Sequence, residues 1–558
     1  MKKLISLLLT LVLAIGCIVP AFAAQADIII TVANDLHLDL EDSFAESVKK
    51  KNSLSEEYFH AASGGQMVYE SYAIIKAFLE KAAENESEFV ILPGDVTNNG
   101  LIEEHEYLAG MLREFESTTG KEVFVVPGNH DLYKTTVAEF ESIYAEFGYN
   151  TAVANDPDSG CYLADLKNGY MLLGIDSCTP KLSPHGMTEE RIDWIETQLK
   201  AAKAQGKKVI AMMHHNLVEH YILGAKIHTG AIVTKDSYRL ADVLADGGVK
   251  YIFTAHTHNH DVTSYTSENG NTIYEAVTNS LTQYPCAFRV VTFGEKVNIT
   301  TDYVRSIDTS LVPEGIHENA AKLMESNFLL YAKNYTYTGV KAVISSYIKA
   351  SQLKRILKTD DETINSVVER AAVKLEEIVS LPIYEKDAAE GEKSVEAMAK
   401  ELKIDFPETD YRTTLDLVVE IYQAQVEGDE NYAAYSDEMI LFTRILAVAI
   451  NYAFSDVTAD EFIAVLNYVA SLLDFNISSD IINAVGNSVD KFRGAELFVT
   501  SVVLPVLGEF GVDSAPADNN VTLPGYESSE DAESFLDKIR AFFKKIFDFF
   551  HMLFAMIA

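Results

Sequence analysis

Seven side chains in the first half of the chain are of the types that bind divalent metal ions. They comprise two carboxylates, four imidazoles and one amide: Asp35, His37, Asp95, Asn129, His214, His256 and His258. This set suits ions of intermediate softness such as Mn, Fe, Zn or Co, and the absence of cysteine argues against a closed structural zinc site. Seven protein ligands are too many for one ion with an open position, so the set predicts two ions that share a bridging carboxylate.

A metal pair of this kind favours chemistry at phosphorus. Two ions about 3.5 to 4 Å apart can contact both the attacking and the leaving oxygen of a phosphoryl group. Coordination also lowers the pKa of a bound water toward about 7, so that hydroxide is available as a nucleophile at neutral pH.

Each block of ligand-type residues follows an apolar, strand-like run. The five runs are residues 28–32, 89–92, 123–126, 209–213 and 251–253. Ligands of open α/β sheets bind at the carboxyl ends of the strands, where loops from several strands converge on one crevice. Short β-rich runs alternate with helical stretches over residues 25–310, which predicts an α/β layered fold for this part of the chain.

The order and spacing of these blocks resemble those of a known family. The blocks are Asp35-x-His37, Gly94-Asp95, Gly128-Asn129-His130-Asp131, His214-His215 and His256-x-His258. They are similar, in the same order, to the five motifs of the calcineurin-like metallophosphoesterases. The resemblance extends over residues 27–305, which is half of the chain.

The resemblance implies a four-layer α/β/β/α fold, followed here by an all-helical C-terminal domain, and a role for each residue. The implied ligands are Asp35, His37 and His258 for the first metal, and Asn129, His214 and His256 for the second. Asp95 would bridge the two ions. His130 would contact the phosphate and protonate the leaving oxygen, with Asp131 as its orienting partner. The implied reaction is hydrolysis of a phosphate mono- or diester by a hydroxide held between the metals.

Two positions depart from the family pattern. Ala255 stands where the family usually has a glycine before the last histidine pair, and Asn216 stands where a proline often follows the paired histidines. Alanine fits unless the backbone needs a positive φ, so the first departure bears on the geometry of the loop more than on ligation.

Taken singly, the motifs have simpler explanations. Asp35-x-His37 alone is typical of a turn with a capping aspartate, and Gly94-Asp95 alone is typical of a turn at a strand end. Asn129-His130-Asp131 could cap a helix over residues 137–147. Five ordered blocks, each placed after a strand, favour the metal centre over these explanations.

The charge of the chain limits its partners. The 83 acidic residues outnumber the 45 basic ones and give a formal net charge of -38, which repels polyanions and argues against extended nucleic acid as a partner. A small-molecule or lipid-linked phosphoester is the expected substrate. Beyond the first 24 residues the cysteines are Cys161, Cys178 and Cys286, too few for a disulfide framework.

Residues 1–24 predict the cellular location. They have a basic start, a Leu-rich run and the small-residue site Ala21-Phe22-Ala23, which are the three parts of a secretory signal peptide. We therefore expect a secreted or extracytoplasmic protein. The stretch Ala14-Ile15-Gly16-Cys17 is a weak lipobox, which leaves lipoprotein processing open.

The second half of the chain has a different pattern of apolar and polar residues. Amphipathic helical patterns dominate residues 311–510, where Thr458 and Glu461 form a capping box. Residues 511–533 are polar and poor in large apolar side chains, as expected of a linker.

Residues 534–558 predict an amphipathic helix that is too short to cross a bilayer. Its aromatic face and basic cluster suit contact with a membrane interface, and docking on the helical domain or self-association explains them equally well.

Two other functions remain open. A surface protein could keep the metal centre for stability or recognition without catalysis, but a purely structural site needs no acid such as His130 beyond its ligands. A nuclease is the other alternative, and the acidic net charge argues against it. The pattern leaves the native metals, the particular phosphoester and the oligomeric state undetermined.

Overall fold

The computed structural model describes residues 28–40, 64–178, 187–220, 237–313, 318–428, 430–432, 436–472 and 515–526. The signal peptide predicted at residues 1–24 and the amphipathic helix predicted at residues 534–558 lie outside these ranges. Of the helices that the structure does describe, none has both the length and the apolar character needed to cross a membrane.

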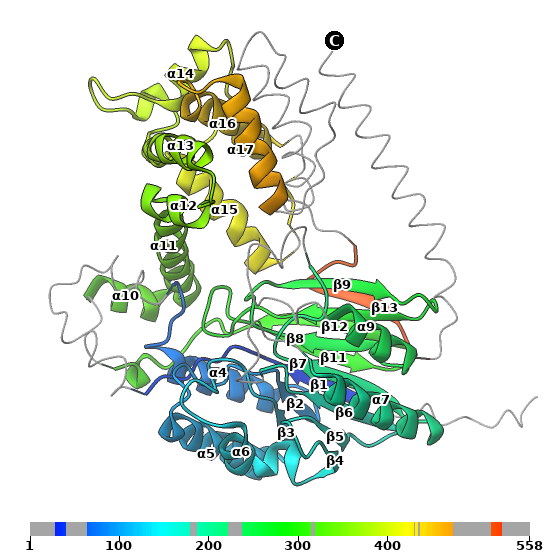
Figure 1. Ribbon diagram of the computed structural model, residues 1–558. Helices are drawn as coiled ribbons and strands as arrows, with labels where there is room; N and C mark the ends of the chain where they lie inside the picture. Colours follow the sequence, from blue (N-terminus) through cyan, green and yellow to red (C-terminus); the bar gives the residue numbers. More distant parts are fainter. Residues whose placement is uncertain are drawn as a thin grey trace, which may run out of the picture.

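Two β-sheets form the centre of the first half of the chain (Figure 1). The order of the six described strands in the first sheet is β13 (Asn520–Pro524), β12 (Lys296–Tyr303), β11 (Ala287–Phe293), β1 (Ile28–Val32), β2 (Phe89–Leu92) and β3 (Glu122–Val125). β1, β2 and β3 run parallel, with Val32 opposite Ile91 and Leu92 opposite Val125, whereas β11, β12 and β13 join antiparallel.

The second sheet has seven strands in the described part of the chain. Their order is β4 (Ala152–Asn155), β5 (Tyr162–Asp165), β6 (Tyr170–Ile175), β7 (Lys208–Met213), β8 (Tyr251–Thr254), β10 (Thr272–Val277) and β9 (Asp261–Thr266). β6, β7, β8 and β10 run parallel, and the outer strands are antiparallel to their neighbours. The parallel strands are almost entirely buried, which explains their near-continuous apolar sequences.

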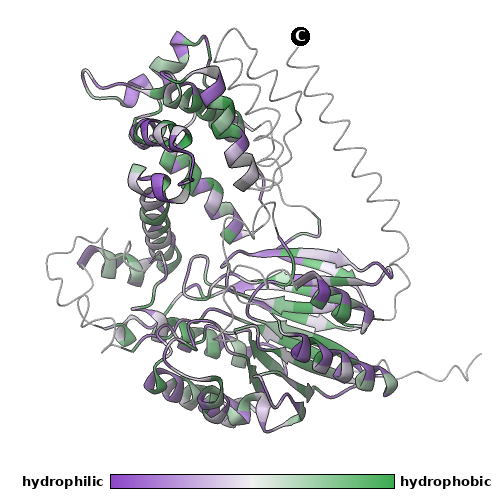
Figure 2. Ribbon diagram, viewed as in Figure 1, coloured by the Kyte–Doolittle hydropathy of each residue, from purple (hydrophilic) through white to green (hydrophobic). Residues whose placement is uncertain are grey.

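Helices cover the outer faces of both sheets. Those packed with the first sheet are α4 (Ser71–Glu84), α5 (Ile102–Thr119) and α6 (Val137–Ile143), followed by the short turn η1 (Ala145–Tyr149), and those on the second are α7 (Glu189–Ala204) and α9 (Ser237–Asp246). Figure 2 shows apolar residues concentrated on the strands, while the exposed sides of α5 and α7 are hydrophilic.

Alternation along the strands produces four layers. In β7, Ile210 and Met212 belong to the core between the two sheets, whereas Val209, Ala211 and Met213 belong to the separate core beneath α7 and α9. Successive side chains of a strand point to opposite faces, so one apolar strand serves two cores. The predicted α/β/β/α order is therefore confirmed.

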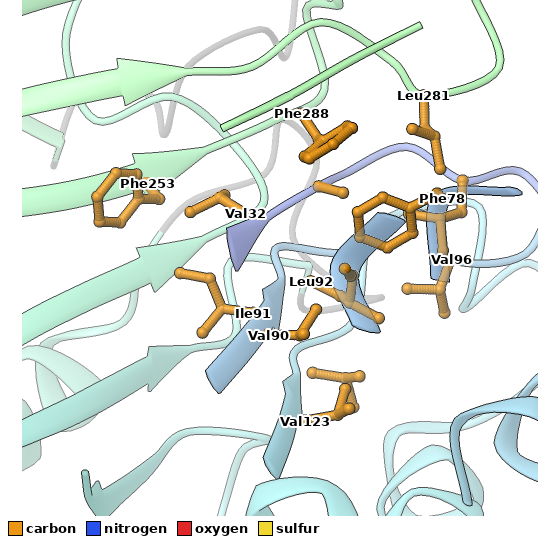
Figure 3. Close-up of a cluster of buried hydrophobic side chains, with 14 of the residues drawn as sticks. Val32, Phe78, Val90, Ile91, Leu92, Val96, Val123, Phe253, Leu281 and Phe288 are labelled. Atoms are coloured by element: carbon orange, nitrogen blue, oxygen red, sulfur yellow. The ribbon is translucent and has the colours of Figure 1, made fainter. Parts of the chain in front are cut away.

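Figure 3 shows the two sides of the first sheet. The ring of Phe253, from β8, lies beside Val32 of β1 in the layer between the sheets. On the helix side, the rings of Phe78 from α4 and Phe288 from β11 meet edge to face with their centroids 5.3 Å apart. These contacts fix the strands whose carboxyl ends carry the ligand-type residues.

A helical region follows the two sheets. Its elements are η2 (Thr309–Leu311), α10 (Glu318–Ser326), α11 (Phe328–Ile348), α12 (Ala350–Ile356), α13 (Glu362–Ser380), η3 (Glu385–Asp387), α14 (Val395–Glu401), α15 (Thr414–Glu427), α16 (Asp437–Ala453) and α17 (Ala459–Leu472). The predicted capping box precedes α17: Thr458 N donates to Glu461 Oε2 at 2.8 Å, and Glu461 N donates to Thr458 Oγ1 at 3.3 Å. α13 to α17 build cores of their own, but the first half of α11 is part of the core of the sheets.

The prediction of a linker over residues 511–533 is wrong for its described part. Residues 520–524 form β13, which pairs antiparallel with β12 over Asn520 to Pro524. Only Leu523 in this strand is buried, because β13 lies at the edge of the sheet. Edge strands tolerate proline and polar residues, so the polar composition that predicted a linker is equally compatible with an edge strand.

Candidate metal centre

The ligand-type side chains lie in loops at the carboxyl ends of strands from both sheets. β1, β2 and β3 lead into the loops that carry Asp35, Asp95 and Asn129, and β7 and β8 lead into those that carry His214 and His256. Because the strands within each set run parallel, these loops meet at one edge of the domain. The structure brings together all seven side chains predicted as metal ligands.

Asp35, His37 and His258 form one group, which we call the first subsite. His258 Nε2 lies 3.5 Å from Asp35 Oδ1 and 3.4 Å from His37 Nε2, and each residue offers one ligand atom within 4.8 Å of the others. Asp35 and His37 are fully buried, while 16% of the His258 side chain is exposed.

Asp95, His214, His256 and Asn129 form the second subsite. His214 Nε2 lies 3.3 Å from Asp95 Oδ2, 3.0 Å from Asn129 Oδ1 and 3.2 Å from His256 Nδ1. The atoms of this cluster are too close together to be a set of independent surface groups, and their spacing around a common point suits one ion.

Partners behind two imidazoles orient them toward the subsites. His214 Nδ1 lies 3.0 Å from the carbonyl oxygen of Pro93, and His258 Nδ1 lies 3.0 Å from Gln283 Oε1. Each of these oxygens accepts a hydrogen bond from Nδ1–H, so in the neutral ring the lone pair is on Nε2, on the side of the subsite. This arrangement is typical of histidines that bind metals.

Five of the seven residues have a positive φ, which is uncommon for residues other than glycine. They are Asp35 (49°), His37 (44°), Asp95 (47°), His256 (71°) and His258 (58°). Each such residue costs on the order of 1 to 2 kcal/mol. Hydrogen bonds between the loops hold them in place, including His37 N to Asp95 O at 3.0 Å. Strained backbone concentrated at one cluster is typical of a functional site.

The loop after β3 passes very close to Asp95. His130 N donates to Asp95 Oδ1 at 2.7 Å. A Cβ atom at Gly128 would lie 2.2 Å from both Asp95 N and Asp95 Oδ1, a distance that no side chain permits. Gly128 is therefore required, because any side chain at this position would prevent the loop after β3 from lying so close to the loop after β2.

The electrostatics of the centre alternate between charged and neutral imidazoles. Burial lowers the pKa of His214, but the facing Asp95 carboxylate outweighs it and raises the pKa to about 9. Burial and the neighbouring His214 lower the pKa of His256 to about 3, and burial and His130 lower the pKa of His37 to about 3. Burial alone would raise the pKa of Asp95, but His214 holds it well below its usual range.

A buried carboxylate oxygen in the first subsite also favours a bound cation. Asp35 Oδ1 is buried and has no hydrogen-bond partner among the described residues. A buried carboxylate oxygen without a partner is costly, and a cation at the first subsite would satisfy it.

The amino-acid sequence of residues 28–260 matches the family model described as calcineurin-like phosphoesterase. This part of the chain is thus similar in sequence to members of that family. The match extends from β1 to the loop after β8 and contains all seven ligand-type residues. The family and fold predicted from the motifs are thus confirmed.

Individual relatives are distant or cover only part of the chain. Probable glycerophosphodiester phosphodiesterase GpdQ of Arcobacter nitrofigilis is 30% identical over 161 residues, 28% of this chain and 54% of that protein. The chain thus spans about half the length of this curated relative. A dimetal phosphatase of Danio rerio gives a TM-score of 0.36 at 12% identity, over 49% of this chain and 95% of that one. A purple acid phosphatase of yellow lupin gives 0.35 at 13%, over 50% and 52%.

His130 lies at the metal centre, in one group with His37 and Asp95, but Asp131 does not orient it as predicted. His130 Nδ1 lies 2.7 Å from the carbonyl oxygen of Asn98, which accepts its hydrogen bond. The carboxylate of Asp131 is fully buried and instead accepts hydrogen bonds from the backbone N–H groups of Val96, Thr97 and Gly128. Asp131 therefore holds two ligand-bearing loops together, and the Asn98 carbonyl takes the place beside His130 that was predicted for it.

The capping explanation for Asn129-His130-Asp131 is excluded. The cap of α6 is Thr136, whose side chain accepts a hydrogen bond from Glu139 N, and the helix begins only at Val137. Asn129 and His130 are therefore free to face the phosphoesterase site.

Three polar side chains at the metal centre escaped prediction. Gln283 orients His258, Gln66 lies 3.1 Å from His37 Nε2, and Asn34 donates to the carbonyl oxygens of Thr254 and Thr278. Gln283 belongs to a polar block that directly follows β10, so the pattern that located the other loops could have found it. Gln66 follows no strand, and its sequence gives no comparable signal.

The two departures from the family motifs are accommodated. Ala255 does not have a positive φ, so alanine fits where glycine is usual. Asn216 is buried and donates from Nδ2 to Thr254 Oγ1 at 3.0 Å and to Ala255 O at 3.4 Å. The asparagine thus connects the loop after β7 to the loop after β8.

Proposed function

We propose that this chain is a metal-dependent phosphoesterase that hydrolyses phosphate mono- or diesters with two divalent ions. The position of Asp95 carries the proposal. Its carboxylate forms one ligand group with His214 and His256 and another with His37 and His130. A carboxylate that belongs to two adjoining groups can bridge two ions, as phosphoester hydrolysis by a metal pair requires.

The residues have separate parts in this reaction. Bound at the two subsites, a pair of divalent cations would supply positive charge for the phosphate oxygens and lower the pKa of water. His130 directs Nδ1 to the Asn98 carbonyl, so Nε2 is the atom that can pass a proton to the leaving oxygen. The His130 side chain is partly exposed, so it can contact the leaving oxygen of a substrate. Asp35 and His37 are buried, so they can contact only the cations.

Small phosphoesters are the proposed substrates. The similarity to a probable glycerophosphodiester phosphodiesterase supports a small phosphodiester as the first compound to test. The net charge of -38 disfavours long polyanions such as nucleic acids.

The variant Asp95→Asn tests the proposal. Asparagine removes the charge that a bridging ligand supplies, so we expect hydrolysis of p-nitrophenyl phosphate and bis-p-nitrophenyl phosphate with Mn²⁺ to fall by at least about 10³-fold. Elemental analysis should show that less than two ions per chain remain. Asp158→Asn, which changes an exposed aspartate far from the ligand loops in sequence, is the matched control and should behave as the wild type.

The outcomes separate the alternatives. Activity and metal content that both persist in Asp95→Asn would show that Asp95 does not bridge. A wild-type protein that binds two ions but cleaves no phosphoester with any divalent metal would instead be a non-catalytic metal-binding protein.

A further inference from the structure

The side-chain amide of Gln66 lies beside the first subsite. Its Nε2 lies 3.1 Å from His37 Nε2 and 3.4 Å from both His258 Nδ1 and His258 Nε2. The amide group is therefore within hydrogen-bond reach of the two imidazoles that, with Asp35, make up the subsite. Its position immediately before the buried residues 67–71 limits how far it can move away.

The chemistry of an amide makes this position significant. The amide N–H of Gln66 can donate to the Nε2 lone pair of the neutral His37 ring, which is the lone pair that a bound cation would use. A bound cation and an amide NH₂ group would repel each other, so rotation of the amide by half a turn would bring Oε1 toward the ion. Carbonyl oxygens are good ligands for Mn²⁺ and similar ions. In the second subsite the amide oxygen of Asn129 already lies in an equivalent relation to His214.

The helical region fixes the loop that carries Gln66. The hydroxyl of Thr336, in α11, donates to the carbonyl oxygen of Gly65 at 3.1 Å. Gly65 has a φ of +92°, and a Cβ atom there would lie 2.9 Å from the carbonyl oxygen of Thr336. Tyr331, one turn earlier in α11, donates its hydroxyl to Glu70. The segment is thus bonded to one helix on both sides of Gln66, through the Gly65 carbonyl and the Glu70 side chain.

The same hydroxyl also holds the loop that orients His258. Tyr284 N donates to Thr336 Oγ1 at 3.0 Å, and the preceding residue is Gln283, whose side chain accepts from His258. Met67 N donates to Thr282 O at 2.7 Å and joins the two loops directly. Thr336 therefore connects the supports on both sides of the first subsite.

We propose that Gln66 completes the ligand set of the first subsite through its amide oxygen, and that Thr336 of α11 is the positioning residue that holds it there. This inference rests on the proposed function, since it requires a metal ion at the first subsite. It makes the helical region a structural part of the metal centre.

Metal titration of Gln66 variants tests the ligand role. Calorimetric titration of the metal-free full-length protein with Mn²⁺ should show binding of the first-subsite ion weakened at least about tenfold in Gln66→Leu, with binding at the second subsite unchanged. Gln66→Glu keeps an oxygen at the same position and should restore or strengthen binding. A loss in both variants would mean that the NH₂ group matters rather than the oxygen, and would overturn the proposal, as would titration curves identical to that of the wild type.

A second pair of variants tests the positioning role. Thr336→Val removes the hydroxyl with little change of shape, and Thr338→Val is its control because Thr338 bonds only within α11, to Asn334 O. Thr336→Val should weaken the same ion as Gln66→Leu, while Thr338→Val should not. Equal effects of the two valine variants would overturn the role of Thr336. If the wild type binds two ions and hydrolyses esters but the metal affinity of Gln66→Leu is unchanged, the ligand role of Gln66 is wrong and the proposed function stands. If the wild type binds no ion, both the ligand role and the proposed function are wrong.

Discussion

The imidazoles of the metal centre differ in charge because they face different neighbours. His214 and His258 face carboxylates, and in both cases the carboxylate outweighs burial and raises the pKa of the ring. His37 and His256 face other imidazoles, so burial and repulsion lower the pKa of each to about 3. The His214 ring of the metal-free centre therefore carries a second proton at neutral pH, whereas His37 and His256 are neutral and already present free lone pairs.

Metal binding should accordingly release protons. A metal ligand must be a neutral imidazole, so an ion can bind His214 only after displacing the proton that its pKa of about 9 retains at pH 7. We expect the affinity for Mn²⁺ to rise by about tenfold per pH unit between pH 7 and pH 9 and to level off above. Calorimetry at pH 7 in two buffers of different ionisation enthalpy counts the protons directly. A result of no released proton would contradict the assigned charges.

The sequence was sufficient to predict the site residues that directly follow a strand. It was not sufficient to predict a site residue such as Gln66, which follows no strand. The ligand-type residues occur in short motifs with fixed spacing, so types and order were sufficient to locate them. Gln66 lies in the segment before α4, and its proximity to His37 depends on the hydrogen bond between Thr336 and Gly65, which joins distant parts of the chain. No local pattern encodes such a contact.

The loops at the ends of β2 and β3 are held together by one carboxylate. Asp131 accepts hydrogen bonds from Val96 N, Thr97 N, Thr97 Oγ1 and Gly128 N at 2.8 to 3.2 Å. Val96 and Thr97 directly follow Asp95 in the loop after β2, and Gly128 directly precedes Asn129 in the loop after β3. Asp131 therefore determines the separation of two ligand-bearing loops without touching the reacting groups.

Asp131→Asn separates this role from orientation of His130. One carboxylate oxygen becomes an NH₂ group that cannot accept from the buried N–H donors, so we expect the free energy of unfolding to fall by about 3 kcal/mol. The pH dependence of kcat should keep its shape, because His130 retains its bond to Asn98 O. Urea denaturation and a pH profile measure the two quantities. A displaced pH profile at unchanged stability would instead favour the orienting role.

Among the elements, the buried strands were predictable and the edge strand was not. β1, β2, β7 and β8 are apolar runs buried on both faces, so their composition identifies them. β13 buries little and contains asparagine and proline, and its extended conformation depends on its pairing with β12. Such a strand is defined by its partner rather than by its own residues.

The two halves of the molecule meet at a buried acid. Glu70, next to the start of α4, receives a hydrogen bond from Tyr331 of α11, and its other oxygen has no hydrogen-bond partner among the described residues. Burial raises the pKa of Glu70 to about 7. Ionising this carboxylate places an uncompensated charge at the contact between the sheets and the helical region.

Glu70→Gln should therefore stabilise the protein at high pH. Between pH 4.5 and pH 7 an unfolded Glu70 loses the proton that the folded protein keeps, so stability falls as pH rises and the deficit is complete above pH 7. Glutamine still accepts from Tyr331 and never ionises. We expect it to raise the free energy of unfolding by about 3 kcal/mol at pH 8 and by much less at pH 5.

Urea denaturation at the two pH values provides the measurement. Glu80→Gln alters an exposed acid on the same helix and is the control, for which we expect no pH-dependent difference. A gain of the same size at pH 5 and pH 8 would show that Glu70 does not change its ionisation over this range.

The last strand of the first sheet is synthesised after the whole helical region. β13 pairs with β12, Tyr251 donates its hydroxyl to Pro524 O, and Tyr526 packs against Tyr170 of the other sheet. A ribosome that has completed β12 has therefore produced a sheet whose outer edge is still unpaired. The first sheet is therefore completed only after translation has passed α17, when the helices between β12 and β13 have already been synthesised.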